Sequence, residues 1–530
     1  MFEGKHSVTT GLSHLKRTAV SLCLAVVWAA AAMAAAPGEA RALTNDIVGL
    51  YIHQHWPYHY PYAARTWRVE DYRAYCGGLK AIGYNTIMIW PVLETVPSPM
   101  TDSDRANLTK IATVIDMLHN ELHMRADIVL CPNVGVKDAE ARKATFEQRH
   151  FFYCDTRENP ADPKALAALI ERRREVFRPL RNVDGVAIID SDPGGYPGST
   201  NPEFVNLLLA HRRLFDSLRP GIELVYWVHV GWPAYGRHYA GGKFGYNSEA
   251  EYVEALTLLK QANPEPWGIA NGLPYAQKVG VADRVVSYNY GRIEGEPSLP
   301  MTRFDYAGAY EAGHSKGPRG VMGNAQTHCV QLPNTFAFAR GAAGKPVARE
   351  DFVQFANDLI PGQGELIVQC WESLEQPGTG KVRDLAARLD KLSAKGMKAG
   401  PLHGLLFDNP QRFVTDLAYM LLLKAAYNDF VTASESGQGV KPALKEFVDA
   451  LASWQQRTGY ENMWSWPKLG ETLARLHSPP VDKVMRRDIL NPARDEGTTP
   501  LERVANSLAR NETFTPNLVQ ALRETLKTMP

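Results

Sequence analysis

Two stretches of the sequence concentrate side chains that can take part in chemistry. The first, YIHQHWPYHYPY at 51–62, holds three histidines, His53, His55 and His59, among five aromatic residues. The second, IIDSDPGG at 188–195, carries Asp190 and Asp192 just before a Pro-Gly-Gly turn. Such histidines can bind a metal or hydrogen-bond a substrate, and two neighbouring carboxylates can serve as a proton donor and an ionised partner. The position of these residues in the fold decides which chemistry applies.

Apolar, β-branched segments alternate with segments of helical periodicity from residue 46 onward. Eight segments predict strands: 46–53, 84–94, 126–134, 183–190, 222–230, 267–272, 284–291 and 319–327. Helical periodicity covers 66–83, 103–122, 163–180, 201–218 and 248–262 between them. Nearly continuous apolar strands are typical of parallel strands that are buried on both faces. This number of units favours a closed (β/α)8 TIM barrel over an open doubly wound sheet.

After about residue 346 the strand pattern ends and helical periodicity dominates. It is clearest over 382–397, 410–431, 441–459 and 516–528. We therefore predict a catalytic barrel over 43–345, followed by a C-terminal α-helical domain over 346–530 that covers the barrel as scaffold.

The first 42 residues have the pattern of a signal peptide. Lys16 and Arg17 precede a short apolar run at 19–32, and Ala40-Arg41-Ala42 is a small-residue cleavage site. A run this short and this rich in alanine favours export to the periplasm or the medium over an uncleaved N-terminal anchor. No later segment is apolar and long enough to span a bilayer, so we expect no membrane association of the mature form.

Composition and motifs argue against other classes of protein. The chain has 58 lysines and arginines against 57 acidic residues, a balance that disfavours an electrostatic nucleic-acid binder. No G-x-G-x-x-G follows the first predicted strand, and no Walker-type loop is present, so we expect no cofactor. None of the six cysteines forms a C-x-x-C pair, and we expect no disulfide framework.

Active sites of such barrels lie at the carboxyl ends of the strands, where Asp190 and Asp192 follow the fourth predicted strand. Side chains alternate along a strand, so both carboxylates should share a face with Val186 and Ile188 and point to the barrel mouth. One of them then donates a proton while the other stays ionised, as glycosidic cleavage requires. The alternative is that one aspartate only caps the turn. Glu94, after the second strand, is either a reserve catalytic carboxylate or a solvated loop residue.

Aromatic and uncharged polar residues follow most of the other predicted strands. Flat aromatic faces stack on pyranose rings, while histidines and amides hydrogen-bond the hydroxyl groups. The alternative for any single aromatic residue is a place in the core. The predicted substrate-binding residues are His53, His55, Trp56, Trp90, Trp227, His229, Tyr288, Asn289, Asn324 and Gln326.

A metal site is the main rival interpretation of the histidines. The H-x-H at 53–55 resembles the start of the metal site in amidohydrolase-type barrels, and His229 and Asp190 would extend it. That pattern also uses a lysine after strand four, a histidine after strand six and an aspartate after strand eight. Here the corresponding positions differ, so we expect no metal.

Two segments resemble the glycoside-hydrolase barrels of the β-hexosaminidase type. GLKAIGYNTIMIWPVLE at 78–94 resembles their first helix and second strand, and VDGVAIIDSD at 183–192 resembles their acidic fourth strand. Ser191 separates Asp190 from Asp192, whereas the hexosaminidase type carries an adjacent acidic pair. The resemblance implies a secreted glycoside hydrolase acting on a poly- or oligosaccharide. We expect Asp192 to be the general acid, Asp190 its partner and Glu94 the reserve. The alternatives are a metal-dependent hydrolase and a non-catalytic carbohydrate-binding barrel.

Overall fold

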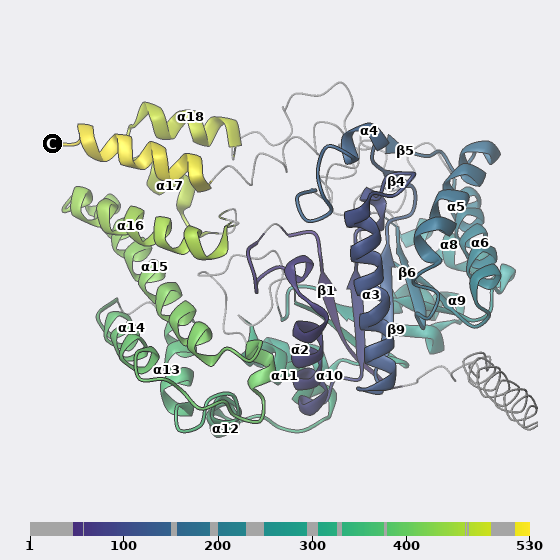
Figure 1. Cartoon of the computed structure of the whole chain (residues 1–530), viewed down its shortest axis with the longest axis horizontal. Helices are drawn as coiled ribbons and strands as arrows, with labels where there is room; N and C mark the ends of the chain where they lie inside the picture. The colour runs from purple at the N-terminus through teal and green to yellow at the C-terminus, as the bar shows by residue number, and fades with distance from the viewer. Residues whose placement is uncertain are drawn as a thin grey trace, which may run out of the picture. The chain divides into compact units, whose positions relative to one another are not determined.

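Eight parallel strands close into a barrel in the computed structural model (Figure 1). The structure describes residues 46–56, 58–149, 156–190, 200–228, 249–293, 306–325, 331–375, 379–459, 461, 463, 466–488 and 515–530. The barrel strands are β1 (Ile47–His53), β2 (Thr86–Trp90), β3 (Arg125–Leu130), β6 (Gly185–Ile189), β7 (Glu223–Trp227), β8 (Trp267–Ala270), β9 (Val285–Asn289) and β10 (Gly320–Ala325). The prediction of a (β/α)8 barrel is confirmed, with strand ends that differ from the expected ones by a few residues.

The first and last strands complete the ring by pairing with each other. Going round the barrel, the order is β1, β10, β9, β8, β7, β6, β3 and β2. Tyr51 of β1 lies opposite Asn324 of β10, and His53 lies opposite Trp90 of β2. This register brings the chemistry-bearing ends of the first, second and last strands together.

Helices surround the strands, as the alternating pattern predicted. They are α2 (Val69–Ile82), α3 (Asp102–Asn120), α5 (Pro163–Phe177), α6 (Asn201–Leu218), α8 (Glu249–Ala262), α9 (Leu273–Val279), α10 (Tyr306–His314) and α11 (Leu332–Ala342). Short elements fill the connections: η1 (Ala64–Thr66), η2 (Leu93–Thr95), α4 (Asp138–Ala141), η3 (Ala282–Arg284) and the hairpin β4 (Val134–Gly135) with β5 (Thr156–Arg157). Sequence analysis did not predict this two-stranded hairpin.

The chain after the barrel is helical, as predicted. Its elements are α12 (Arg349–Leu359), α13 (Gly364–Glu375), α14 (Thr379–Ser393), η5 (His403–Leu406), α15 (Pro410–Ser436), α16 (Val440–Thr458), α17 (Leu469–Ala474), α18 (Pro479–Asp488) and a helix over 515–528. Residues 44–530 form a single compact unit. Within it the Tyr62 hydroxyl donates to Asp416 Oδ2 of α15 at 2.5 Å. The predicted domain boundary at 345/346 stays a prediction.

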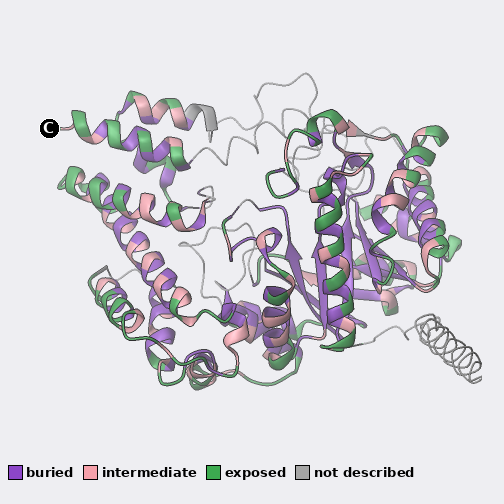
Figure 2. Ribbon diagram, in the orientation of Figure 1, coloured by how far each residue is buried: buried purple, intermediate pink, exposed green. Residues whose placement is uncertain are grey.

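Each barrel strand contributes to two separate apolar cores. Figure 2 shows the barrel strands as buried, whereas the surrounding helices have exposed faces. The outer core joins the outward strand faces to the helices and contains Val186 and Ile188 of β6. The inner core fills the barrel and contains Ala187 and Ile189 of the same strand. This division follows from the two-residue period of a strand and explains why the strands are apolar on both faces.

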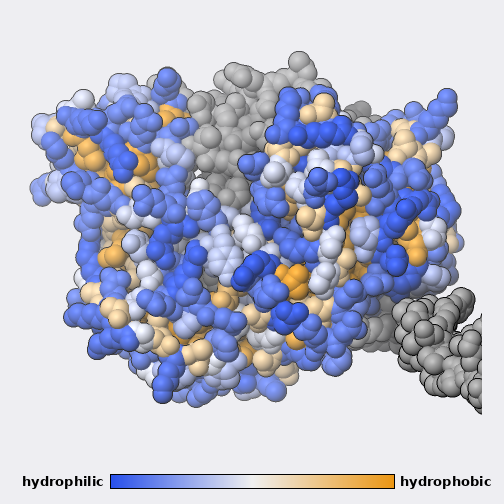
Figure 3. Space-filling view, viewed as in Figure 1, coloured by the Kyte–Doolittle hydropathy of each residue, from blue (hydrophilic) through white to orange (hydrophobic). Residues whose placement is uncertain are grey.

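Hydrophilic residues dominate the face of the molecule drawn in Figure 3, where hydrophobic residues form small separate groups. Among the described residues, the exposed large hydrophobic side chains are Tyr290 and Tyr306. No helix in the described ranges is both long and apolar enough to cross a membrane.

Four charged side chains form a layer inside the barrel, near the amino ends of the strands. Arg125 donates through Nε to Asp127 Oδ2 at 2.9 Å and through Nη2 to Glu223 Oε2 at 2.6 Å. Arg319 pairs with both carboxylate oxygens of Glu223. Burial alone would raise the pKa of Glu223, but Arg125 and Arg319 outweigh burial and hold this pKa below its usual value. We call these four residues the ion layer.

Two glycines make room for the ion layer. A Cβ atom on Gly185 of β6 would lie 2.6 Å from Arg125 Nη2 and 2.7 Å from Asp127 Oδ1. A Cβ atom on Gly268 of β8 would collide with Arg319 and Glu223. Even one added methyl group would therefore displace a buried charge from its partner.

We expect Gly185→Ala to lower the free energy of unfolding by about 3 kcal/mol or more, because breaking a buried ion pair leaves a charge unpaired. Chemical denaturation checks this value. Gly77→Ala in α2 is the matched control, since its Cβ would meet nothing closer than Leu122 Cδ2 at 4.0 Å. A loss at Gly185 no larger than at Gly77 would contradict the steric argument.

Candidate active site

Two histidines and an asparagine form a buried chain of contacts at the carboxyl end of β1. His53 Nδ1 lies 3.0 Å from His55 Nδ1, and His53 Nε2 lies 3.0 Å from Asn324 Oδ1. All three side chains are buried. Burial lowers the pKa of His53 to about 3, although the hydrogen bond to Asn324 opposes the shift. His53 is therefore an uncharged imidazole at neutral pH.

The uncharged state of His53 fixes how its protons are arranged. Asn324 Oδ1 can only accept a hydrogen bond, so His53 Nε2 carries the proton and donates. His53 Nδ1 is then an acceptor, and His55 Nδ1 must donate to it. The sequence predicted these three residues at the site, and the structure brings them together as one relay.

Aromatic rings form a continuous layer directly below this relay in the barrel. Tyr51 lies 4.0 Å from His53, 5.1 Å from Trp227 and 6.3 Å from Trp90, measured between ring centroids. Tyr288 lies 4.4 Å from Trp227 and is the one partly exposed ring of this layer among the described residues. Trp90 and Trp227 are buried in the inner core, and their predicted contact with a substrate stays a prediction.

Trp56 lies beside His55, with ring centroids 4.6 Å apart, and it is also buried. The ring of His55 lies 5.4 Å from that of Trp90. The two tryptophans therefore contact the histidine relay from the ends of two neighbouring strands.

Glu94 is a buried carboxyl group at the end of the second strand unit. Its Oε1 accepts a hydrogen bond from the backbone N–H of Cys131, and its Oε2 lies 3.4 Å from Trp90 Nε1. Burial raises the pKa of Glu94, against the opposing effects of Arg173 and the Cys131 N–H. A solvated loop glutamate was the alternative for this residue, and its burial contradicts that alternative.

Glu94 also lines a cavity of about 540 Å³ between η2, the β4–β5 hairpin and α5. Charged side chains such as Arg172, Arg173 and Glu175 of α5 line the same cavity. None of the rings of the aromatic layer lines this cavity. We therefore place the candidate substrate site over the aromatic layer.

Asp190 differs from expectation in the direction of its side chain. It follows β6 on the face of Val186 and Ile188, which is the outer face of the barrel. Its Oδ2 accepts a hydrogen bond at 3.1 Å from the hydroxyl of Tyr226, whose ring packs against Phe204 of α6. The expectation that this face points to the barrel mouth is therefore wrong, because parallel strands bury apolar residues on both faces.

Other predicted residues are not brought to the histidine relay by the structure. Asn289 Nδ2 donates to the carbonyl of Ala312 in α10 at 3.0 Å, so its amide points outward. Asp192, His229 and Gln326 lie outside the described residues, and their roles stay predictions.

Sequence analysis missed the two buried arginines that hold the loops at this end of the barrel. Arg65 donates to the carbonyls of Gln54 and His55 at 2.6 and 2.7 Å, and to those of Glu147 and Arg149 at 2.9 Å. These bonds join the loop after β1 to the loop after β3. The only available signal was an arginine close to the histidine-rich stretch, which is too general to assign a role.

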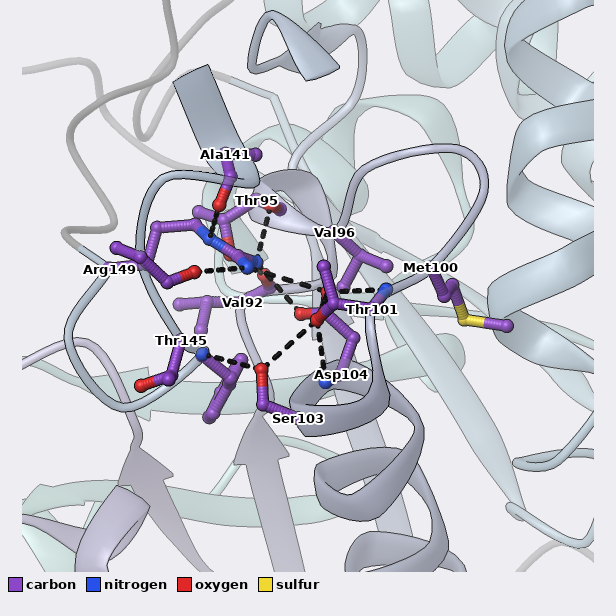
Figure 4. A network of polar contacts seen from close by, with 12 residues as sticks. Val92, Thr95, Val96, Met100, Thr101, Ser103, Asp104, Ala141, Thr145 and Arg149 are labelled. Carbon is purple, nitrogen blue, oxygen red and sulfur yellow. Dashed lines mark hydrogen bonds and ion pairs between the residues drawn. The ribbon is translucent and has the colours of Figure 1, made fainter. Parts of the chain in front are cut away.

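Arg149 continues this clamp to the loop after β2 (Figure 4). Its guanidinium pairs with Asp104 Oδ1 of α3 at 2.7 Å and donates to the carbonyl of Thr95 at 2.8 Å. Thr95 directly follows Glu94, so the clamp holds both the histidine relay and the buried glutamate. The sequence offers no pattern that distinguishes Arg149 from a surface arginine.

Comparison with solved structures finds similarity to several glycoside hydrolases, at low TM-score and low identity. The chain is similar to a GH138 enzyme targeting pectin rhamnogalacturonan II, with a TM-score of 0.42 and 12% identity over 79% of this chain and 63% of that one. A GH115 4-O-methyl-α-glucuronidase with specificity for decorated arabinogalactans matches with a TM-score of 0.40 and 9% identity, over 78% of this chain and 59% of that one. The Thermobaculum terrenum O-GlcNAc hydrolase matches with a TM-score of 0.38 and 12% identity, over 93% of this chain and 99% of that one.

At these identities and TM-scores the likeness assigns no function, and this chain spans less than two thirds of the first two enzymes. No protein-family model matches the sequence, and no curated protein matches it either.

The lowered pKa of His53 predicts a stability that depends on pH. The folded pKa of about 3 lies below the unfolded value of 6.5, so the contribution is fully present above pH 6.5 and is lost as pH falls towards 3. At pH 5 the loss should be about 2 kcal/mol, at ~1.4 kcal/mol per pH unit. Urea unfolding of wild type and His53→Gln at pH 7 and pH 5 measures it.

The difference in free energy of unfolding between wild type and His53→Gln should be about 2 kcal/mol smaller at pH 5 than at pH 7. His211, whose pKa burial also lowers to about 3, is present in both proteins, so its contribution cancels. If the free energy of unfolding depends equally on pH in wild type and variant, His53 already accepts a proton in the folded chain.

Proposed function

We propose that the chain is an exported glycoside hydrolase that cleaves a poly- or oligosaccharide. The observation that carries this proposal is the uncharged histidine–asparagine relay lying on a layer of aromatic rings at the catalytic end of the barrel. Hydroxyl groups bind to such polar groups, and the C–H faces of pyranose rings stack on aromatic rings. Export rests on the signal-peptide pattern of the first 42 residues.

Carboxyl groups at the ends of two strands support the hydrolytic chemistry. Burial raises the pKa of Glu94, and a raised pKa is what a proton donor to a glycosidic oxygen requires. In our proposal Asp192 is the general acid. Asp190, held by the Tyr226 hydroxyl, orients it from the outer side of the strand. Glu94 is the reserve for the acid role.

A metal-dependent hydrolase is the second candidate, and the close approach of His53 to His55 is what favours it. Both ring nitrogens of His53 already have protein partners, so a metal would have to displace one of them. Within the described ranges, no group of three or more histidine, cysteine, aspartate or glutamate side chains is placed so that it could hold a metal ion. A non-catalytic sugar-binding barrel would bind the same ligands without cleaving them.

Asp192→Asn tests the assignment of the acid. It keeps the size of the side chain but removes the transferable proton, so kcat/KM on a natural glycoside should fall ~10²–10⁴-fold. An aryl glycoside with an acidic leaving group needs little protonation and should be affected less. Asp102→Asn in α3 is the matched control. Because the Asp102 side chain is fully exposed to solvent, this variant should leave both rates unchanged.

Glu94→Gln, measured on the same two substrates, separates the candidates for the acid. Near-wild-type rates in the Asp192 variant, together with a leaving-group-dependent loss in the Glu94 variant, would transfer the role to Glu94. An absence of hydrolysis over a broad polysaccharide panel by the wild-type protein, with sugar still bound, would leave the non-catalytic alternative.

Exhaustive chelation tests the metal-dependent alternative. We expect hydrolysis to survive dialysis against EDTA, because the proposed chemistry uses carboxyl groups and not a metal-bound water. Activity before and after dialysis, and metal analysis of the protein, measure this directly. A loss that Zn²⁺ restores would favour the amidohydrolase-type site of His53, His55 and His229.

A further inference from the structure

A small cavity lies inside the barrel between the ion layer and the aromatic layer. Its volume is about 20 Å³. Arg125, Asp127, Glu223 and Arg319 line it on one side, and Trp227 and Tyr288 line it on the other. A cavity needs roughly 10–15 Å³ of such space to hold one water molecule, so this one has room for a single water.

Three polar atoms on the lining residues have no hydrogen-bond partner within the described part of the chain: Trp227 Nε1, Asp127 Oδ1 and Arg319 Nε. All three side chains are more than nine-tenths buried. An unsatisfied polar atom at such a site costs about 1–3 kcal/mol, so three of them on residues that line one cavity point to a common partner.

We propose that this cavity binds one ordered water molecule, which joins the indole of Trp227 to the ion layer. Trp227 Nε1 and Arg319 Nε are donors, and Asp127 Oδ1 is an acceptor. A water oxygen accepts from both donors and gives one hydrogen to the carboxylate, which satisfies all three atoms. Chloride would face the Asp127 carboxylate, and ammonium would face two N–H donors, so neither ion fits this set.

The water gives the aromatic layer a polar anchor beneath it. The Trp227 ring lies at steep angles to the rings of Tyr51 and Tyr288, and the bound water would link its indole N–H to the ion layer. The orientation of the rings below the proposed substrate site then depends on charges at the opposite end of the barrel. The proposal does not require that the protein be a glycosidase.

Filling the cavity distinguishes a bound water from an empty space by the sign of the effect. Val286→Ile and Val225→Ile each add one methylene group to a lining residue. If water is bound, its displacement leaves buried polar atoms unpaired and the melting temperature falls. If the cavity is dry, the added methylene fills a void and the melting temperature rises. Val321→Ile, in the outer core, is the control for overpacking.

Transfer of magnetisation from water to the indole N–H of Trp227 measures the same interaction in the intact full-length protein. Trp227→Phe identifies the signal by its loss. We expect a cross-peak from a long-lived bound water in wild type and its loss in the Val286→Ile variant. A wild-type Trp227 signal without such a cross-peak, or a rise in melting temperature in both filled variants beyond the control, would overturn the proposal.

Discussion

The pairing of four charges inside the barrel is the constraint on which the other features depend. Arg125 and Arg319 share Glu223, and Arg125 also binds Asp127. Charges buried in this way are tolerated only when each has a partner of good geometry, because desolvation costs several kcal/mol per ion. The partners come from or directly before three different strands, so a shift in strand register would separate them. Gly185 and Gly268 are required at their positions because any side chain there would occupy the space of these ions.

Buried arginines hold the loops in place at the other end of the barrel. Arg65 has lost most of its solvation, and burial lowers its pKa to about 10, which still leaves it protonated at neutral pH. Its hydrogen bonds run to backbone carbonyls of two loops, and Arg149 extends the same arrangement to a third loop. A planar group with five donors suits this task, since loop carbonyls have no strand partners. His55 and Glu94 thus keep their positions although they lie beyond the regular strands.

Much of the fold was predictable because its signals are local. Each barrel strand is a short apolar run, and each flanking helix has its own periodicity and caps, as in the capping box of Thr101 and Asp104 at α3. The direction of the Asp190 side chain was not predictable, since a strand that is apolar on both faces does not reveal which face is inner. The ion layer was not predicted for a different reason. Arg125, Glu223 and Arg319 lie where strands begin, and charged residues there usually belong to exposed loops. Contacts such as His53 with Asn324, 271 positions apart, exist only once the barrel has closed.

Charge is distributed unevenly along the barrel axis, and this bears on the kind of ligand the site can bind. The amino end holds paired ions, whereas burial shifts the pKa values of His53 and Glu94 at the carboxyl end towards their uncharged forms. His53 has lost its basicity through burial, burial raises the pKa of Glu94, and Asn324 carries no charge at any pH. A ligand held by an ion pair would need a fixed charge there, and the relay offers only hydrogen bonds. Neutral, hydroxyl-rich molecules match such a surface because each hydroxyl both donates and accepts, and this match links the electrostatics of the barrel to the carbohydrate substrate proposed above.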